Sequence, residues 1–381
     1  MDKRILHTPE GVRDIYGQEY AKKLAVEEQL HQTFRSFGYQ DIQTPTFEFF
    51  DVFSKEIGTT PSKELYKFFD KEGNTLVLRP DFTPSIARCA AKYFIDETLP
   101  VRFCYSGNTF TNTSNLQGKL KEVTQMGAEL IGDPSVEADA EVISMVIEAQ
   151  KSAGLTRFQV TIGEVDYFRG LCEEAGLDED TESELRSCIS GKNFFAAQEL
   201  LEQKQIPEPY HSILLKLADM FEDMESLEAA KALAKNERSL QAIARLEKLK
   251  ERLAQYNVAE YISFDLGMLS KYQYYTGVVF KAYTYGIGDA VVKGGRYDNL
   301  LRKFGKDAAA IGFVIVIDDL LEALSRQKVD IAIPASGKVL YYNVEDEADY
   351  RTKLAEAMKL RKEGIPTVLS PENKKAEEVR Q

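Results

Sequence analysis

Residue types that bind metals or form disulfides are scarce in this 381-residue sequence. The cysteines are Cys89, Cys104, Cys172 and Cys188, with no C-x-x-C pair, and the histidines are His7, His31 and His211, far apart along the chain. Zinc sites and disulfide frameworks need such residues at short, regular spacings. We therefore expect no bound metal, no cofactor and no disulfide framework.

Long apolar runs and an excess of positive charge are also missing. No segment approaches the roughly 20 apolar residues that span a bilayer, and the first residues, MDKRILHTPEGVRD, lack the apolar core of a secretory signal. The net charge of −13 and the pI near 5 disfavour a nucleic-acid surface, which needs clustered Lys and Arg. We expect a soluble, cytoplasmic protein that binds neither membranes nor nucleic acid.

Two familiar nucleotide-binding motifs are absent as well. GIGDAV, which begins at Gly286, lacks the third glycine of a dinucleotide loop, and no G-x-x-x-x-G-K-[ST] occurs. The chain is therefore not expected to bind a nucleotide through either motif.

What the sequence does contain is a series of strand signals. Residues 18–37 first show apolar side chains at helical spacing, ending before Gly38. The strand-like segments that follow are YQDIQTP, TLVLRP, VRFCYSG, LKEVTQMGAELIG, RFQVTIG, YQYYTGVVFKAYTYG, AVVKGG and IGFVIVI. Most lack the intervening helices of a parallel βαβ sheet, so we predict an α+β fold with a mostly antiparallel sheet and helices on one face.

Two other parts of the chain have a different character. Residues 166–255 are rich in Leu, Ala, Glu and Lys with helical periodicity, which predicts a helical insertion between two halves of one core, 1–165 and 256–332. After IPASG, residues 337–381 have the pattern of a small, truncated β-α-β unit. That unit is too short for a sizeable core of its own.

The segment LKEVTQMGAELIG carries a candidate polar site. Alternation along a strand places Gln125, Gly127 and Glu129 on one face. An amide and a carboxylate would then flank a gap left by the glycine, a shape suited to a small polar cation. The same residues fit a solvated face of the sheet, and this segment alone favours that interpretation.

The segment LRPDFTPSIAR offers a second candidate. Thr83 before Pro84 is typical of a helix N-cap followed by proline at the first helical position. Asp81 lies on the same side of an extended segment and suits either a ligand ammonium or the role of an ordinary loop acid.

Aromatic residues cluster in SKYQYYTGVVF, which contains Tyr272, Tyr274 and Tyr275. These rings suit stacking on, or hydrogen bonding to, an imidazole or a sugar, although aromatic strands more often belong to a core. GGRYD, from Gly294 to Asp298, would let backbone approach a ligand closely, but paired glycines more often form a turn.

In order and spacing these blocks resemble histidyl-tRNA synthetase, a class II synthetase, over roughly residues 8–330. LRPDFT is similar to that family's L-R-P-E-G-T segment, and SGNTFTNTSNLQGKLKEVTQMGAELIG to its second class II motif. SKYQYYTGVVF resembles its R-G-L-D-Y-Y block, GGRYD matches a histidine-specific block, and AAIGFVIVIDDLL resembles the third class II motif. The resemblance implies the class II fold, with residues of about 18–45 at a homodimer interface, although their apolar stripe fits an intradomain core equally well.

The departures from the family pattern fall on positions that handle ATP. By the resemblance, the lost ATP-site positions are Thr111, Thr113, Ser270, Asp318 and Asp319. Thr111, Ser270 and Asp319 stand where the family has arginines. Each arginine would stabilise developing phosphate charge, and losing one such donor costs roughly 2.7–4 kcal/mol. The resemblance therefore implies that adenylation chemistry is lost and that the chain has no catalytic residue.

The positions that contact the amino acid in the synthetase are largely kept. Carried over to this chain, they are Asp81, Thr83, Gln125, Glu129, Tyr272, Tyr274, Tyr275 and Tyr297. Asp81 is a conservative change from glutamate, whereas Tyr272 replaces a leucine. Two acids without metal ligands suit an ammonium and an imidazole, because a buried cation needs a paired anion. The missing arginines leave recognition of the ligand's carboxylate unexplained.

A synthetase-like chain that keeps the histidine pocket and lacks most of the anticodon-binding domain resembles the regulatory subunits of short-form ATP phosphoribosyltransferase, the first enzyme of histidine biosynthesis. This resemblance implies a non-catalytic chain that assembles with the ATP phosphoribosyltransferase catalytic subunit in a hetero-oligomer, as a homodimer, and confers feedback inhibition by L-histidine. Residues 111–121 are a candidate surface for that subunit or an ordinary exposed loop.

Two other hypotheses stay open. A divergent ligase that adenylates another amino acid would need a phosphate clamp, for which Lys119, Lys121 and Arg296 are the candidates near the motifs. A binding module that senses tRNA or histidine is disfavoured by the acidic charge and the short C-terminal unit.

Overall fold

The computed structural model describes residues 6–54, 60–98, 100–113, 120–218, 227–269, 274–333 and 337–372. The chain divides into two compact units, Met1–Ile331 and Ala332–Gln381. Across the described residues, none of the helices combines the length and the apolar character needed to cross a membrane.

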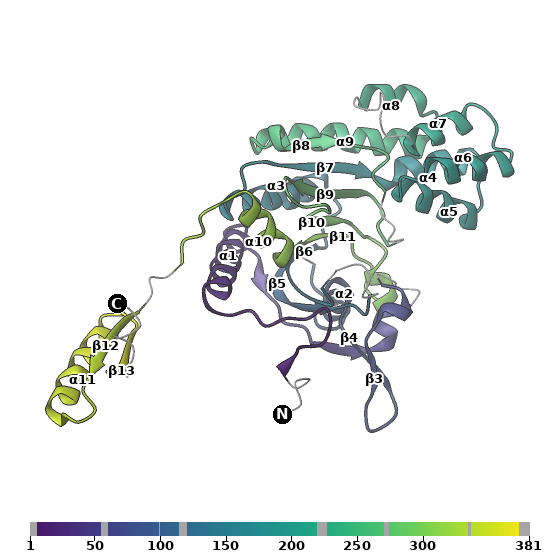
Figure 1. The fold of residues 1–381 in the computed structure, drawn as a ribbon. Coiled ribbons are helices and arrows are strands. Elements are labelled where there is room, and N and C mark those ends of the chain that lie inside the picture. The colour runs from purple at the N-terminus through teal and green to yellow at the C-terminus, as the bar shows by residue number, and fades with distance from the viewer. Residues whose placement is uncertain are drawn as a thin grey trace. The chain divides into compact units, whose positions relative to one another are not determined.

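An eight-stranded sheet forms the centre of the larger unit (Figure 1). Its strands are β1 (Gln40–Asp41), β5 (Val101–Phe110), β6 (Glu122–Ile131), β7 (Phe158–Glu164), β8 (Ile262–Phe264), β9 (Val278–Thr284), β10 (Val292–Arg296) and β11 (Ala310–Val316). The order is β1-β5-β6-β11-β10-β9-β7-β8, antiparallel except for the edge pairs β1/β5 and β7/β8. The predicted, mostly antiparallel sheet is confirmed.

Helices cover both faces of this sheet. On one face α1 (Gly17–Ser36), α3 (Val136–Ser152) and α10 (Ile317–Arg326) share a core with Met126, Ala128 and Leu130 of β6. On the opposite face α2 (Thr83–Tyr93) and the short 3₁₀ helix η6 (Leu301–Phe304) pack with Phe103 and Tyr105 of β5. The expectation of helices on one face only is wrong, because the strands bury side chains on both of their alternating faces.

The apolar stripe of α1 lies in the chain's own core. Val26, Leu30 and Phe34 are fully buried against α3 and the sheet. Of the two interpretations of this stripe, the intradomain one is therefore the one observed. Tyr20 and Leu24, on another side of the same helix, are 46% exposed.

Between residues 165 and 255, the described residues form helices joined by short loops, and none of them belongs to a strand. The helices are α4 (Val165–Glu174), α5 (Glu179–Ser190), α6 (Phe194–Gln203), α7 (Tyr210–Ala218), α8 (Leu227–Leu233) and α9 (Glu237–Gln255). Figure 1 shows them gathered beside β7. Their apolar side chains join the core beneath α3, so the insertion and the sheet share one continuous interior.

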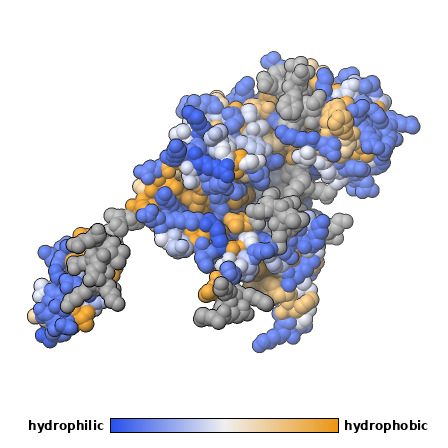
Figure 2. All heavy atoms as spheres, viewed as in Figure 1, coloured by the Kyte–Doolittle hydropathy of each residue, from blue (hydrophilic) through white to orange (hydrophobic). Residues whose placement is uncertain are grey.

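The larger unit also contains a three-stranded antiparallel sheet. It consists of β2 (Phe47–Phe49), β4 (Thr75–Leu78) and β3 (Lys67–Phe69), flanked by the 3₁₀ turns η2 (Phe50–Phe53) and η3 (Ser62–Glu64); a further turn, η5 (Ala259–Tyr261), precedes β8. Phe47, Phe49 and Phe69 are exposed on this small sheet. Figure 2 shows hydrophobic groups there on a face that is otherwise mainly hydrophilic.

The smaller unit is a β-α-β element. The parallel pair β12 (Lys338–Tyr342) and β13 (Thr367–Pro371) packs against α11 (Glu347–Lys362). Leu340, Ala357 and Thr367 are its buried side chains among the described residues.

Candidate functional site

The carboxylate of Glu129 lies at the centre of the candidate site. Its side chain is 1% exposed, and it projects from β6. The hydroxyl of Thr83 donates to Oε1 at 2.8 Å, and the hydroxyl of Tyr297 donates to Oε2. The tertiary structure thus brings together residues from β6, from the first turn of α2 and from the segment after β10.

A glycine on the next strand makes room for this carboxylate. Gly312 of β11 is the cross-strand partner of Glu129, and a Cβ atom at Gly312 would collide with the carboxylate. The glycine of β11 is therefore required for the observed position of Glu129.

Burial raises the pKa of Glu129 to about 8. Desolvation of the carboxylate is the main cause, and the nearby charge of Asp81 adds to it, while the hydrogen bonds from Tyr297 and Thr83 act in the opposite direction. A carboxyl group with this pKa is mostly protonated at neutral pH. An incoming cation would favour its ionised form.

Thr83 does not cap its helix, which corrects the interpretation drawn from the Thr-Pro pair. Thr83 is the first residue of α2, the N-cap is Phe82, and the Thr83 hydroxyl is committed to Glu129. Asp81 Oδ1 instead accepts the backbone N–H of Thr83 at 3.2 Å. Burial raises the pKa of Asp81 as well, so both acids of the site are held in surroundings that disfavour a bare negative charge.

Most of the predicted residues line a small cavity of about 150 Å³, whereas Glu129 is not among the lining residues and contacts two of them, Thr83 and Tyr297. Its lining includes Asp81, Thr83, Gln125, Tyr274, Tyr275, Lys293, Tyr297 and Gly312. Gln125 Oε1 is buried without a hydrogen-bond partner in the described structure, so it can accept a bond from a ligand. The rings of Tyr274 and Tyr275 lie against each other with centroids 4.5 Å apart and form an aromatic wall.

The gap expected at Gly127 is not open to a ligand. Tyr105, its cross-strand partner on β5, occupies the space where a Cβ atom of Gly127 would lie. Tyr105 also stacks on Phe82 at a centroid distance of 4.4 Å. The sequence analysis missed Tyr105 because only the register between β5 and β6 places it opposite the glycine.

The paired glycines of GGRYD lie within β10 and not in a turn, which corrects that interpretation. A Cβ atom at Gly294 would collide with Phe280, and one at Gly295 would lie 2.7 Å from Tyr275 Cε1. Both glycines therefore make room for aromatic rings of this chain.

Arg296 is structural and is not available as a phosphate clamp. Its side chain is 2% exposed, and its Nε and Nη2 donate to Asp139 Oδ1 at 2.8 and 2.6 Å. The remaining donors bond to Asp298 and to the backbone carbonyls of Asp133 and Ser135.

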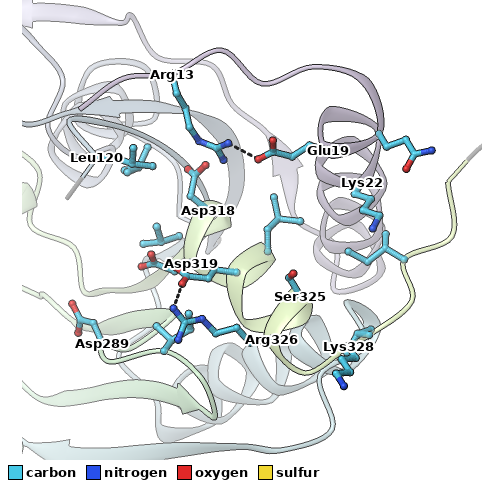
Figure 3. Close-up of a pocket in the computed structure, with 18 of the residues that line it drawn as sticks. Arg13, Glu19, Lys22, Leu120, Asp289, Asp318, Asp319, Ser325, Arg326 and Lys328 are labelled. Carbon is cyan, nitrogen blue, oxygen red and sulfur yellow. Dashed lines mark hydrogen bonds and ion pairs between the residues drawn. The ribbon is translucent and has the colours of Figure 1, made fainter. Parts of the chain in front are cut away.

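Asp318 and Asp319 lie in the first turn of α10 (Figure 3). Asp318 has taken a structural role: Oδ2 accepts the backbone N–H of Thr124 at 2.8 Å, and Oδ1 lies 3.8 Å from the ammonium of Lys23, which is buried. With Asp289 they place three acids on the wall of a larger cavity of about 1220 Å³.

Burial also raises the pKa of Asp319, with Asp289 and Asp318 adding to the effect and a nearby lysine opposing it. These acids would oppose a phosphate group at the start of α10, whereas Arg13, Lys22, Arg326 and Lys328 line other parts of the same cavity.

The other sequence-predicted positions contribute less. Thr111 donates its backbone N–H to the carbonyl of Lys121 at 2.8 Å, and Thr113 Oγ1 is buried without a partner in the described structure. Ser270, Tyr272 and Lys119 lie outside the described residues.

His31, Asp41 and Cys104 form the one cluster of three potential metal ligands among the described residues. Asp41 accepts a bond from Arg35 at 2.7 Å and one from His31, and these bonds, the one from Arg35 most of all, lower its pKa. Burial raises the pKa of Cys104 to about 12, whereas zinc binds the thiolate. We interpret the cluster as a polar network that ties α1 to β1, and the absence of a metal site stays a prediction.

The fold and the pocket together define a histidyl-tRNA synthetase-like protein. Residues 11–320 match the family model described as histidyl-tRNA synthetase. A crystal structure from Bacillus halodurans C, described as an ATP phosphoribosyltransferase regulatory subunit/histidyl-tRNA synthetase, is 34% identical with a TM-score of 0.86, covering 96% of this chain and 93% of that one. Histidyl-tRNA synthetase from Nostoc shares the fold at 19% identity and a TM-score of 0.79, covering 97% of this chain and 86% of that one.

Curated relatives narrow this class to one family. A protein from Acetivibrio thermocellus is 40% identical over 360 residues, which are 94% of this chain and 85% of the relative. One from Thermoanaerobacter pseudethanolicus is 39% identical over 336 residues, 88% of this chain and 87% of the relative. Both are named ATP phosphoribosyltransferase regulatory subunit, and this chain belongs to that family. The family and its regulatory role in histidine biosynthesis agree with the prediction from the sequence.

Proposed function

We propose that this chain binds L-histidine in the cavity lined by Asp81, Thr83 and Tyr297, the last two of which bond to Glu129, and that it transmits feedback inhibition to the catalytic subunit of a short-form ATP phosphoribosyltransferase. The volume of about 150 Å³ supports a ligand smaller than the drug-sized molecules that fill sites of roughly 300–1,000 Å³. The proposed histidine-binding residues are Asp81, Thr83, Gln125, Glu129, Tyr272, Tyr274, Tyr275 and Tyr297.

The observation that carries this proposal is the buried carboxylate of Glu129, oriented by Thr83 and Tyr297. A protonated imidazole or an ammonium near it would favour the ionised carboxylate, because the buried negative charge would then be paired. The unpartnered oxygen of Gln125 supplies an acceptor for a further N–H of the same ligand.

The former ATP-site positions support a subunit without adenylation chemistry. Asp318 is committed to Lys23 and Thr124, and Arg296 is committed to Asp139. Arg296 is therefore not available to hold a phosphate, and Asp318 and Asp319 at the start of α10 would oppose one. These contacts count against the divergent ligase.

Regulation requires histidine to bind one conformation of the assembly better than another, and the coupling between the two subunits' sites is then reciprocal.

We propose a homodimer of this chain within the hetero-oligomer, supported by the exposed Tyr20 and Leu24 on α1. Residues 111–121, of which 114–119 lie outside the described residues, remain the proposed surface for the catalytic subunit. Four free cysteines support a location in the reducing cytoplasm.

The test is to mix the purified chain with a short-form catalytic subunit and to measure phosphoribosyl transfer with and without histidine. We expect activity that depends on this chain and is inhibited by histidine. The Glu129→Gln chain should support the same activity without inhibition. The proposal fails if neither activity nor inhibition depends on this chain, or if the chain alone catalyses exchange between ATP and pyrophosphate with an amino acid.

A further inference from the structure

The cavity contains a cation that the family resemblance did not point to. Lys293 of β10 is the one basic side chain among the described residues that line it. Its ammonium donates to Asp289 Oδ2 at 2.8 Å, and the two side chains are 37% and 58% exposed. The side chain of Lys293 is therefore partly exposed to solvent and also forms part of the cavity lining.

Lys293 projects from the same face of the sheet as the site. It lies two positions before Gly295, which pairs with Gly312, which in turn pairs with Glu129. This places the Lys293 backbone about 7 Å along β10 and about 10 Å across two strands from that of Glu129. A single amino acid and two side chains fill such a separation.

The charges of the site are unbalanced without this lysine. Asp81 and Glu129 suit the cationic groups of a zwitterionic amino acid, but its carboxylate also needs a partner when it leaves water. Asp289 and Asp319 lie on the lysine side, where the charge of Lys293 acts on Asp319. Without a cation beside it, the carboxylate of the ligand would be repelled by these acids.

We propose that Lys293 binds the carboxylate of the amino-acid effector and so replaces the arginines that the synthetase-like site has lost. This inference rests on the proposed function, because it names a contact to the same ligand. Lys293 exchanges its bond to Asp289 for one to the ligand, which is feasible because an exposed ion pair of this kind is weak. The lysine also screens the ligand from the neighbouring acids.

Calorimetric titration with a pair of ligands tests this contact. L-Histidine carries the carboxylate, and L-histidinol has a hydroxymethyl group in its place. Lys293→Met should weaken histidine binding about 10- to 100-fold, the effect of one charged hydrogen bond. The same variant should leave histidinol binding within about 3-fold, because an exposed pair contributes little by itself. Lys293→Arg should retain most of the preference for histidine.

Asp289→Asn is the matched control, because it breaks the same ion pair and keeps the lysine. It should leave histidine binding unchanged or make it tighter. The inference is overturned if Lys293→Met weakens both ligands equally or neither, or if Asp289→Asn weakens histidine as much as Lys293→Met does. If the folded wild-type chain does not bind histidine, the proposed function fails together with this inference. If the wild type binds histidine and the variants give one of the contrary results above, only this inference fails.

Discussion

Replacing Glu129 by glutamine should make the protein's stability less sensitive to a rise in pH between 4.5 and about 8. Because the folded pKa of about 8 lies above the ordinary 4.5, the native state holds a proton that the unfolded chain has already lost between these values. The corresponding stability is complete below pH 4.5 and is lost as the pH rises through 8. The gap of about 3.5 pH units, at 1.36 kcal/mol each, corresponds to about 5 kcal/mol in total.

The glutamine variant has no such proton to lose, and its amide retains partners in Thr83 and Tyr297. Between pH 6 and pH 9 the free energy of unfolding of the wild type should fall by about 3 kcal/mol relative to the variant. Urea unfolding at several pH values measures this difference. Burial also raises the pKa of Glu164 to about 8. This residue is present in both proteins, so its contribution to the pH dependence cancels in the comparison.

Glu148→Gln, on an exposed part of α3, is the control and should run parallel to the wild type. A difference between wild type and Glu129→Gln that stayed constant with pH would refute the reasoning, because it would mean that the carboxylate is already ionised or solvated in the folded protein.

Two other substitutions test the packing of the site. Gly312→Ala should abolish histidine binding, because the added methyl group collides with the pocket glutamate, whereas Gly288→Ala, with open space around it, should bind normally in the same titration. Asp318→Ala should lower the free energy of unfolding by about 2–3 kcal/mol, since it leaves the buried ammonium of Lys23 with fewer partners and a backbone N–H without its acceptor. Asp319→Asn, which relieves repulsion at the same helix start, should cost nothing in denaturant unfolding; equal losses from the two aspartate variants would contradict the structural role of Asp318.

Much of the secondary structure could be predicted from local patterns. Alternating side chains identified β6 and β11, and the i, i+4 spacing identified α1, because burial of one face imposes a period on the chain whatever lies opposite. The same local reasoning went wrong where a distant partner decided the outcome. Thr83 suits an N-cap by its neighbours, yet it bonds to Glu129 of another strand. The glycine pair of β10 suits a turn, yet two aromatic rings from elsewhere in the fold occupy its space.

By itself the sequence determined the family, through its ordered blocks of residues, and the mostly antiparallel sheet, through local periodicity. The acids and tyrosines of the candidate pocket stay a prediction from the family resemblance. Only the tertiary structure decided which side chains occupy the space around that pocket and which charges face it. Tyr105 fills the gap at Gly127, Arg296 is paired with Asp139, and Lys293 lines the cavity. These outcomes depend on strand register and on contacts between residues far apart in sequence, and a shift of one residue would turn each side chain to the opposite face.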